Sequence, residues 1–322
     1  MNEADPLSDV LRSVSLTGAV FLSAELGAPW GFAAPAASAA GHLLAPGTEH
    51  IVLFHLVTDG EAKVRVPGQA DLVLAPGDIV VLPRGDAHEL WSGPRRTFTD
   101  SSYLLPRILD GALTSERGGG DGPLTQFVCG YIGCERHADR LFLAGLPAAF
   151  KVHVRGDASG AWIESAIRHL ASECSAQLAG RRALLAKLAE ALFIDVLRRY
   201  MAELPSERTG WLAAARDPAV GRALAYLHRE PAHPWTLAEL AQRAGVSRSV
   251  LAEHFPRLIG ETPLAYLARW RVQLGARLLR TTDHTVLRIA LDVGYRSEAA
   301  FNRAFKRELG LPPARYRGEI RV

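Results

Sequence analysis

The sequence is poor in cysteine and has no long hydrophobic run. Its 322 residues include three cysteines, Cys129, Cys134 and Cys174, which are too few for a disulfide framework and fit a reducing compartment. No stretch of eighteen consecutive apolar residues occurs, and the start, MNEADPLSDV, lacks a basic region followed by an apolar one. These absences argue against a spanning helix and a signal peptide, and they predict a cytoplasmic protein with no membrane partner.

Charge is distributed unevenly along the chain. From Asp217 to the C-terminus there are 17 Lys and Arg and 10 Asp and Glu, a net charge of +7. The first 216 residues hold 20 and 24, a net charge of −4. A basic segment on an acidic remainder is typical of a protein that binds a polyanion through that segment. An ordinary solvated surface would give the same numbers, so charge alone leaves both interpretations open.

Hydrophobic periodicity divides the chain into three regions. Residues 1–155 contain short apolar runs, such as HIVLFHLV and DIVVLP, between Gly, Pro and Asp turn signals, as in a small β-barrel or sandwich. Residues 156–205 have the period of helices, and residues 215–320 are helical after a polar linker. Gly118 to Gly120 predict a mobile loop rather than a phosphate cradle, because no strand precedes them and no helix follows. The predicted fold class is α+β with several domains.

The helical segment 156–205 reads as two helices joined near Ala179 and Gly180. The second helix has apolar residues on more than one face, so it needs more than one neighbour. Packing on the barrel would cover one stripe, and a helix from a second copy would cover the other and give a homodimer. Burial within a single chain explains the pattern equally well.

The segment WTLAELAQRAGVSRSVLAEHF, which starts at Trp235, has the signals of two helices joined by a short turn. Thr236 and Glu239 can form a capping box, and Gly245 in the turn can adopt positive φ. Ser247 caps the second helix. This is the helix-turn-helix pattern, in which the second helix enters the major groove of DNA. The positions near its start that face outward, and are expected to contact DNA, are Arg248, Ser249, Ala252 and Glu253.

The pattern recurs in TVLRIALDVGYRSEAAFNRAFKR, with caps at Thr285 and Ser297 and a turn at Gly294. The amide of an outward Asn302 suits a bidentate contact with adenine, and basic side chains can reach guanine or phosphate. The expected DNA contacts of this second motif are Glu298, Asn302, Arg303 and Lys306.

A predicted helix from Pro263 to Leu279 separates the two motifs. Its 17 residues would span about 25 Å at ~1.5 Å per residue. A rigid helix of that length could hold the two reading helices in successive major grooves, ~34 Å apart. Two motifs together with the basic surplus predict double-stranded DNA as the partner.

At these residues the chain resembles the AraC/XylS family of bacterial transcription regulators. GYRSEAAFNRAFKRELGLPPARYR, from Gly294 to Arg317, is similar to that family's C-terminal signature. The resemblance implies two helix-turn-helix subdomains that read promoter half-sites, and a regulator that activates or represses transcription with RNA polymerase as a further partner. Glu253 and His254 stand where the family often has basic residues, which implies weaker phosphate anchoring or a different base choice in the first motif.

The region 1–155 resembles the cupin-type sensor domain found in a subset of that family. Gly77, Pro83, Gly85 and His88 match the second cupin motif, in which two bends present the histidine on the following strand. A metal-dependent cupin should also have a His-x-His pair and a glutamate before the Val-x-x-Gly turn. No His-x-His occurs, and Leu53 takes the glutamate position. The two histidines and one carboxylate of a mononuclear iron oxygenase are therefore missing, and we expect no enzyme.

His55 shares a strand face with Leu53 and Val57 by the period of two, so an inward Leu53 implies an inward His55. Neutral imidazole suits Zn, Ni, Cu or Fe, which makes a divalent transition metal a candidate cofactor of the cupin domain. Three interpretations stay open: ordinary core or surface residues, a metal or oxidant-sensing site, and histidines that polarise a small-molecule ligand. Cys129 and Cys134 lie five residues apart and so on opposite faces of a regular strand, unless a turn separates them. The candidate effector or metal residues are His55, His88, Cys129, Cys134 and His137.

The leading hypothesis is a transcription regulator that responds to a small molecule, metal or oxidant through residues 1–155, dimerises through 156–205 and reads DNA through 215–320. One alternative is a cupin metalloenzyme, a dioxygenase or isomerase, fused to a DNA-binding tail. Another is a constitutive DNA-binding protein whose barrel serves only for oligomerisation.

Overall fold

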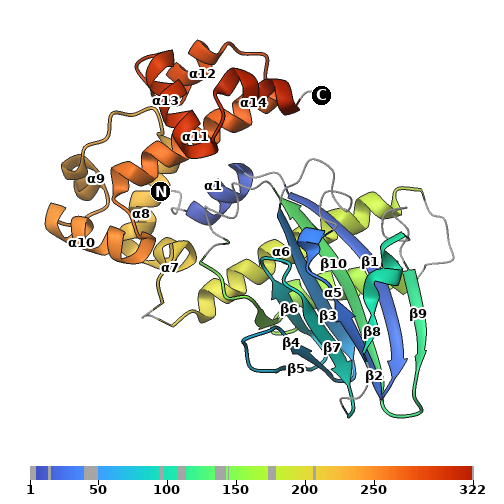
Figure 1. Cartoon of the computed structure of the whole chain (residues 1–322). Helices are drawn as coiled ribbons and strands as arrows, with labels where there is room; N and C mark the ends of the chain where they lie inside the picture. Colours follow the sequence, from blue (N-terminus) through green and yellow to red (C-terminus); the bar gives the residue numbers. More distant parts are fainter. Residues whose placement is uncertain are drawn as a thin grey trace. The chain divides into compact units, whose positions relative to one another are not determined.

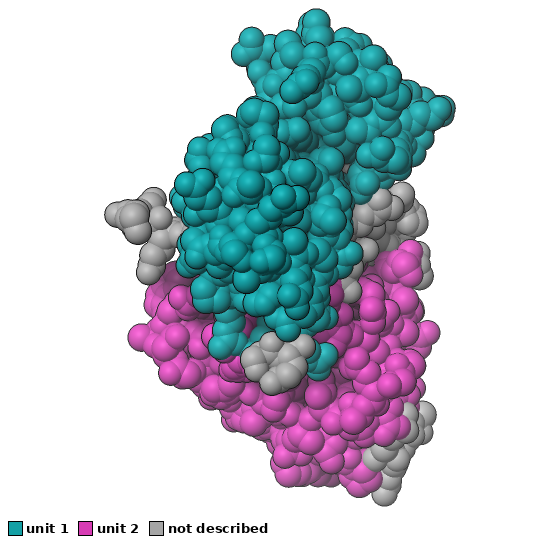
Figure 2. Space-filling view, turned by 90° about the vertical axis from the view of Figure 1, so that its left-hand side faces the viewer, with its two compact units in different colours: residues 1–15, 204–322 teal, residues 16–203 magenta. Residues whose placement is uncertain are grey.

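The computed structural model describes residues 5–13, 16–39, 50–94, 98–106, 114–134, 143, 145–172, 179–205 and 208–320. The chain forms two compact units, coloured separately in Figure 2. One comprises residues 16–203, and the other comprises residues 1–15 together with 204–322. The β-rich region and the helical segment after it thus share a unit, while the first fifteen residues group with the C-terminal region. Within the described part of the chain, no helix is both long and apolar enough to cross a membrane.

The unit of residues 16–203 contains two β-sheets with one core between them (Figure 1). The six-stranded sheet has the order β11-β6-β3-β10-β1-β9. Its strands are β1 (Leu16–Gly27), β3 (His50–Asp59), β6 (Asp78–Leu82), β9 (Thr114–Gly119), β10 (Leu124–Cys134) and β11 (Phe150–His153). The five-stranded sheet has the order β5-β4-β7-β2-β8. Its strands are β2 (Trp30–Ala34), β4 (Ala62–Arg65), β5 (Leu72–Leu74), β7 (His88–Ser92) and β8 (Thr99–Asp100).

The predicted loop at Gly118 to Gly120 is wrong for its first two glycines. Gly118 and Gly119 end strand β9, which pairs in parallel with β1, so that Gly118 lies opposite Leu26. A Cβ atom on Gly119 would lie 2.2 Å from the carbonyl oxygen of Gly27, so glycine is needed for this close approach of two backbones. The glycines that predict a loop in the sequence therefore allow strand β9 to pair with β1 in the structure.

Two helices cover the outer face of the larger sheet: α5 (Ala158–Ser172) and α6 (Arg181–Glu203). They confirm the two helices expected there. Figure 1 shows α6 lying along β1 and β10. The contact is close, because a Cβ atom on Gly18 of β1 would lie 2.5 Å from the carbonyl oxygen of Ala186. Most apolar residues of α6 are buried, but Leu184 and Ile194 are 50% and 39% exposed.

The second unit is helical. In chain order its C-terminal part contains α7 (Trp211–Arg216), α8 (Pro218–Arg229), α9 (Leu237–Arg243), α10 (Arg248–Ile259), α11 (Pro263–Thr281), α12 (Val286–Asp292), α13 (Glu298–Leu309) and α14 (Pro313–Ile320). The predicted spacer helix is present as α11, whose 19 residues give about 28 Å at ~1.5 Å per residue. One face of α11 joins α12 and α13 in a core that includes Ile289, Phe301 and Phe305.

The N-terminal helix α1 (Pro6–Ser13) packs on this helical unit, against α7, α8 and α11. Val10 is fully buried and Leu7 nearly so. Asp9 lies 3.9 Å from Arg229 of α8, and burial raises the pKa of the Asp9 carboxyl. Residues that precede the first strand of the barrel in sequence therefore contribute core to the helical unit.

Candidate functional site

A cavity of about 250 Å³ lies inside the barrel, between the two sheets. Both sheets contribute residues spaced two apart, as expected for side chains on the inner face of a strand. Ala37 and the 3-10 turn Ser101–Leu104 add further wall. The lining comprises Leu22, Phe32, Ala34, Pro35, Ala36, Ala37, Leu53, His55, His88, Leu90, Ser101, Ser102, Leu104, Leu105, Phe127 and Cys129.

Three of the predicted effector residues meet in one corner of this cavity. Antiparallel pairing of β10 with β3 places Cys129 directly opposite His55, and their Sγ and Nδ1 atoms are 2.6 Å apart. The other ring nitrogen of His55, Nε2, is 2.7 Å from Nε2 of His88 on β7. All three side chains are at least nine-tenths buried. His55 thus links a strand of its own sheet to a strand of the opposite sheet.

The hydrogen positions in this cluster follow from one fixed acceptor. Nδ1 of His88 lies 3.0 Å from the carbonyl oxygen of Asp86, which can only accept, so His88 carries its hydrogen on Nδ1. When His88 is neutral, its Nε2 must accept from Nε2–H of His55. Nδ1 of His55 is then free to accept, and the Cys129 thiol donates to it. The result is a chain in which every polar hydrogen of the three side chains is used.

Burial keeps the side chains of His55, His88 and Cys129 uncharged. It lowers the pKa of His55 well below that of an ordinary histidine, with a further lowering from His88, and it also lowers the pKa of His88. Burial raises the pKa of the Cys129 thiol. Because the reactive form of cysteine is the thiolate, a neutral Cys129 of this kind is a poor nucleophile.

The remaining predicted effector residues do not join the cluster. β10 continues without a turn from Leu124 to Cys134, so Cys134 is on the opposite face from Cys129, although it is also buried. His137 lies outside the described residues. Leu53, at the position of the missing glutamate, lines the cavity.

The donor set does not fit a metal ion. Two imidazole nitrogens bound to one tetrahedral ion, with bonds of ~2.0–2.1 Å, would be about 3.3 Å apart. The His55 and His88 Nε2 atoms are at the hydrogen-bonding distance of 2.7 Å, and Cys129 approaches the far nitrogen of His55. Within the part of the chain that the structure describes, no group of three or more His, Cys, Asp or Glu side chains could hold a metal.

The first helix-turn-helix motif comprises α9 and α10. The Thr236 hydroxyl accepts from the backbone N–H of Glu239, and the Ser247 hydroxyl accepts from that of Val250, as the predicted caps require. The Glu239 carboxylate does not complete the capping box, because it contacts His233 and Arg243 instead. Gly245 has φ +73° in the turn. All four residues predicted to face DNA are exposed: Arg248, Ser249, Ala252 and Glu253.

The second motif comprises α12 and α13, capped by Thr285 and Ser297 as predicted. Glu298, Arg303 and Lys306 are exposed along α13. Asn302 is half-buried, and its Oδ1 atom is enclosed with no hydrogen-bond partner in the described part of the chain. A bidentate contact from Asn302 to adenine therefore requires its side chain to turn outward.

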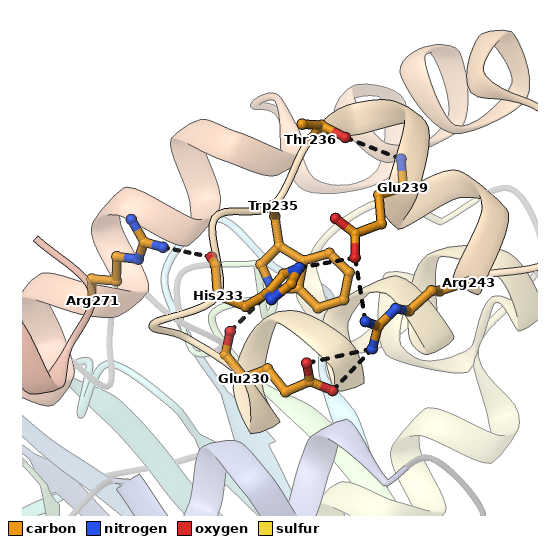
Figure 3. A network of polar contacts seen from close by, with 7 residues as sticks. All are labelled: Glu230, His233, Trp235, Thr236, Glu239, Arg243 and Arg271. Carbon is orange, nitrogen blue, oxygen red and sulfur yellow. Dashed lines mark hydrogen bonds and ion pairs between the residues drawn. The ribbon is translucent and has the colours of Figure 1, made fainter.

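A polar network joins the first motif to the spacer helix α11 (Figure 3). Arg271, on the spacer helix α11, donates to the backbone carbonyl oxygens of Pro231 and His233 at 2.6 and 2.9 Å, in the loop that leads into the first motif. The same loop continues into the side-chain contacts of His233 with Glu239, and of Glu239 with Arg243. Arg243 also lies over the ring of Trp235 at 4.9 Å.

The turn of the second motif packs against the same arginine, Arg271. Gly294 has φ +94°, and a Cβ atom added to it would lie 2.6 Å from Ala232 Cα and 3.0 Å from the Arg271 guanidinium. The backbone of one motif's turn thus packs against the entry loop of the other. Neither Arg271 nor the Asp86 carbonyl could be predicted as part of a site, because a contact to a backbone carbonyl leaves no pattern of residue types in the sequence.

Several known proteins are similar to this chain along almost its full length. A family model described as Cupin matches residues 5–202, and one described as Helix-turn-helix domain matches residues 240–319. An AraC-like transcription regulator of Streptomyces antibioticus is 35% identical over 97% of this chain and 98% of its own length. The HTH-type transcriptional regulator AlkR of Acinetobacter baylyi is 30% identical over 97% and 99%. The RCS-specific HTH-type transcriptional activator RclR of Escherichia coli is 29% identical over 98% of both chains.

The buried histidines predict how stability depends on pH. Burial holds the pKa of His55 and His88 down and lowers the pKa of His228, in the helical unit, to about 3. Below pH ~6.5 these histidines bind protons in the unfolded chain but not in the folded chain, so the free energy of unfolding falls as the pH drops. His55→Phe should flatten this fall by up to about 1.4 kcal/mol per pH unit, measured by urea unfolding between pH 7.5 and 5.5. Equal slopes for variant and wild type would show that His55 titrates as in the unfolded chain.

The Arg271 contacts predict a role in half-site spacing. Arg271→Ala leaves two carbonyl oxygens without their donor and loosens the loop beside Gly294, at a cost of about 1–3 kcal/mol of stability. We expect the variant to tolerate DNA in which the half-site spacing is changed by one base pair better than wild type does, as measured by fluorescence anisotropy. Arg277→Ala, at an exposed position of the same helix, is the matched control. An unchanged spacing preference in Arg271→Ala would contradict this role.

Proposed function

The chain belongs to the AraC family of DNA-binding transcription regulators with a cupin sensor domain, and from this we propose that its barrel cavity holds a small-molecule effector while α10 and α13 read two half-sites. The relatives compared above are transcription regulators rather than enzymes. The missing carboxylate at Leu53 and the hydrogen-bonded His55 and His88 pair agree with that.

The observation that carries the effector proposal is the cavity itself. A space of about 250 Å³ in the middle of a domain is unusual, because protein interiors are otherwise closely packed. It lies within the sensor domain, and its wall is formed by strands of both sheets. A molecule that fills it would change the packing between the sheets, which is a means of biasing two arrangements of the regulator.

Oxidant sensing through Cys129 has less support. Its thiol is neutral, buried and hydrogen-bonded, and Cys134 on the same strand faces the other way. A thiol sensor needs an accessible thiolate and commonly a second cysteine within reach. The structure therefore favours a bound molecule over thiol oxidation as the signal.

DNA reading rests on exposed side chains of the two second helices. Arg303 is exposed on α13 and has no polar partner among the described residues, and Lys306 lies one turn further along. Arg248 occupies the first turn of α10, where the N-terminal part of a reading helix contacts base edges. Contact with RNA polymerase remains a prediction from family resemblance.

The Arg303→Ala variant tests the DNA-reading part of the proposal. We expect a loss of about 1–3 kcal/mol on a cognate operator, and a relaxed preference at one position if Arg303 reads a base. The affinity of wild type should also fall steeply with salt, because phosphate contacts release counterions. Titration of labelled operator and of random DNA at two salt concentrations measures both effects. Equal operator affinities of variant and wild type would rule out the role of Arg303.

We further propose that α6 contacts a second copy of the chain. Its exposed stripe includes Leu184, Ala191 and Ile194, apolar residues placed one or two turns apart. An apolar stripe on a helix whose other face is already buried fits a helix–helix interface better than contact with water.

Ile194→Glu should therefore shift the protein from dimer to monomer in sedimentation experiments, because it places a charge within the proposed stripe. Val73→Glu is the control, since Val73 is 47% exposed on β5 and not on this helix. Unchanged sedimentation of Ile194→Glu would place the dimer interface elsewhere or show that the protein is a monomer.

A further inference from the structure

We infer that the barrel cavity selects an uncharged, hydrocarbon-like molecule of roughly ten carbon atoms, with no polar group at the end that meets His55 and His88. This deepens the proposed function and rests on it, since it assigns a chemical class to the effector.

Most of the wall is apolar. Leucine side chains reach the cavity from β1, β3, β7 and the 3-10 turn, and the rings of Phe32 and Phe127 add two aromatic surfaces. Trp30 stacks behind Phe127 with a ring separation of 5.1 Å, which holds that ring in place. Among the residues that the structure describes, the lining includes no Lys, Arg, Asp or Glu. A charged ligand would therefore lose its hydration without gaining a partner of opposite charge.

The polar corner offers nothing to a ligand, because its members satisfy one another. The Cys129 thiol donates to His55, His55 donates to His88, and His88 donates to the Asp86 carbonyl. No hydrogen of these groups remains for an incoming oxygen or nitrogen. A ligand hydroxyl placed in this corner would have to break an existing bond or stay unpaired, and both reduce affinity.

The two serines are the other polar part of the wall. Ser102 is exposed although it lines the cavity, so the cavity opens to solvent beside the turn Ser101–Leu104. A polar group is tolerated at this end, where water is within reach. The stricter constraint, against any polar group on the ligand, thus applies at the inner end, at the two histidines.

The size of the cavity sets the size of the ligand. An engineered apolar cavity of ~150 Å³ holds benzene, with six carbon atoms. At the same ratio, a cavity of about 250 Å³ has room for roughly ten. Sugars and nucleotides are excluded by polarity, and the carbons of a fatty chain beyond about ten would extend through the open end into water.

The test uses two ring compounds of the same shape and different polarity, 1,3-dimethylbenzene and 1,3-dihydroxybenzene. Equilibrium dialysis of the purified full-length chain against each should show that the dimethyl compound binds at least tenfold more tightly. Similar affinities, tighter binding of the diol, or no binding of either compound would overturn the inference.

Two matched variants locate the binding. Ala34 and Ala33 are neighbours on β2, but Ala34 lines the cavity and Ala33 points to the other face of the strand. Ala34→Leu should lose at least tenfold in affinity for 1,3-dimethylbenzene, while Ala33→Leu should stay within twofold of wild type. If Ala34→Leu fails to fold, Ala36→Leu fills the same cavity from outside the strands. Equal affinities of a folded filling variant and Ala33→Leu would overturn the inference.

His55→Ala tests the polar corner directly. It leaves the Cys129 thiol and Nε2 of His88 without their partner, so a ligand hydroxyl gains a place to bind. The ratio of affinities for the dimethyl compound and the diol should shrink at least fivefold relative to wild type. An unchanged ratio would show that the hydrogen bonds of Cys129, His55 and His88 do not cause the preference. Titration of operator DNA with the same preparations distinguishes two outcomes. If the protein binds operator DNA but neither ring compound, only the assigned ligand class is overturned. If it does not recognise the operator, the proposed function is overturned.

Discussion

The register between β10 and β3 fixes what the cavity contains. Cys129 lies opposite His55 in that pairing, and a slip by one residue would turn Cys129 to the other face of the sheet and bring Val128 or Gly130 into its place. Because His55 uses both ring nitrogens, one toward Cys129 and one toward His88, the register also joins the larger sheet to the smaller one. The hydrogen bonds of Cys129, His55 and His88 thus connect the two sheets, and the same three side chains line the cavity.

Much of this arrangement could be predicted from local patterns. Alternation along HIVLFHLV placed Leu53 and His55 on one face, and the bends at Gly77 and Gly85 placed His88 at the start of a strand, as the structure shows. The helix caps at Thr236, Ser247, Thr285 and Ser297 are likewise present. These features depend on residues within a few positions of one another, which is why a single sequence can indicate them.

Contacts to backbone atoms, and contacts between segments far apart in the sequence, could not be predicted in this way. The acceptor that fixes the histidine tautomers is the carbonyl of Asp86, and a carbonyl is the same in every residue. A run of glycines predicts a loop, because glycine is most often a turn residue, whereas here Gly118 and Gly119 allow β9 to approach Gly27. The packing of α1 on the helical unit depends on Leu7 and Val10, two apolar residues in a short helix whose partner lies some two hundred residues away.

The turn at Gly294 has a consequence for how such proteins can diversify. Its backbone occupies the space beside Ala232 and Arg271, so the second motif fits only an entry loop of this shape in the first. The outward positions of α10 and α13 touch none of this and can change one at a time. On the proposed reading of DNA by α10 and α13, new operator preferences are reached through surface substitutions on these two helices. Exchanging a whole motif would require its partner to be exchanged with it.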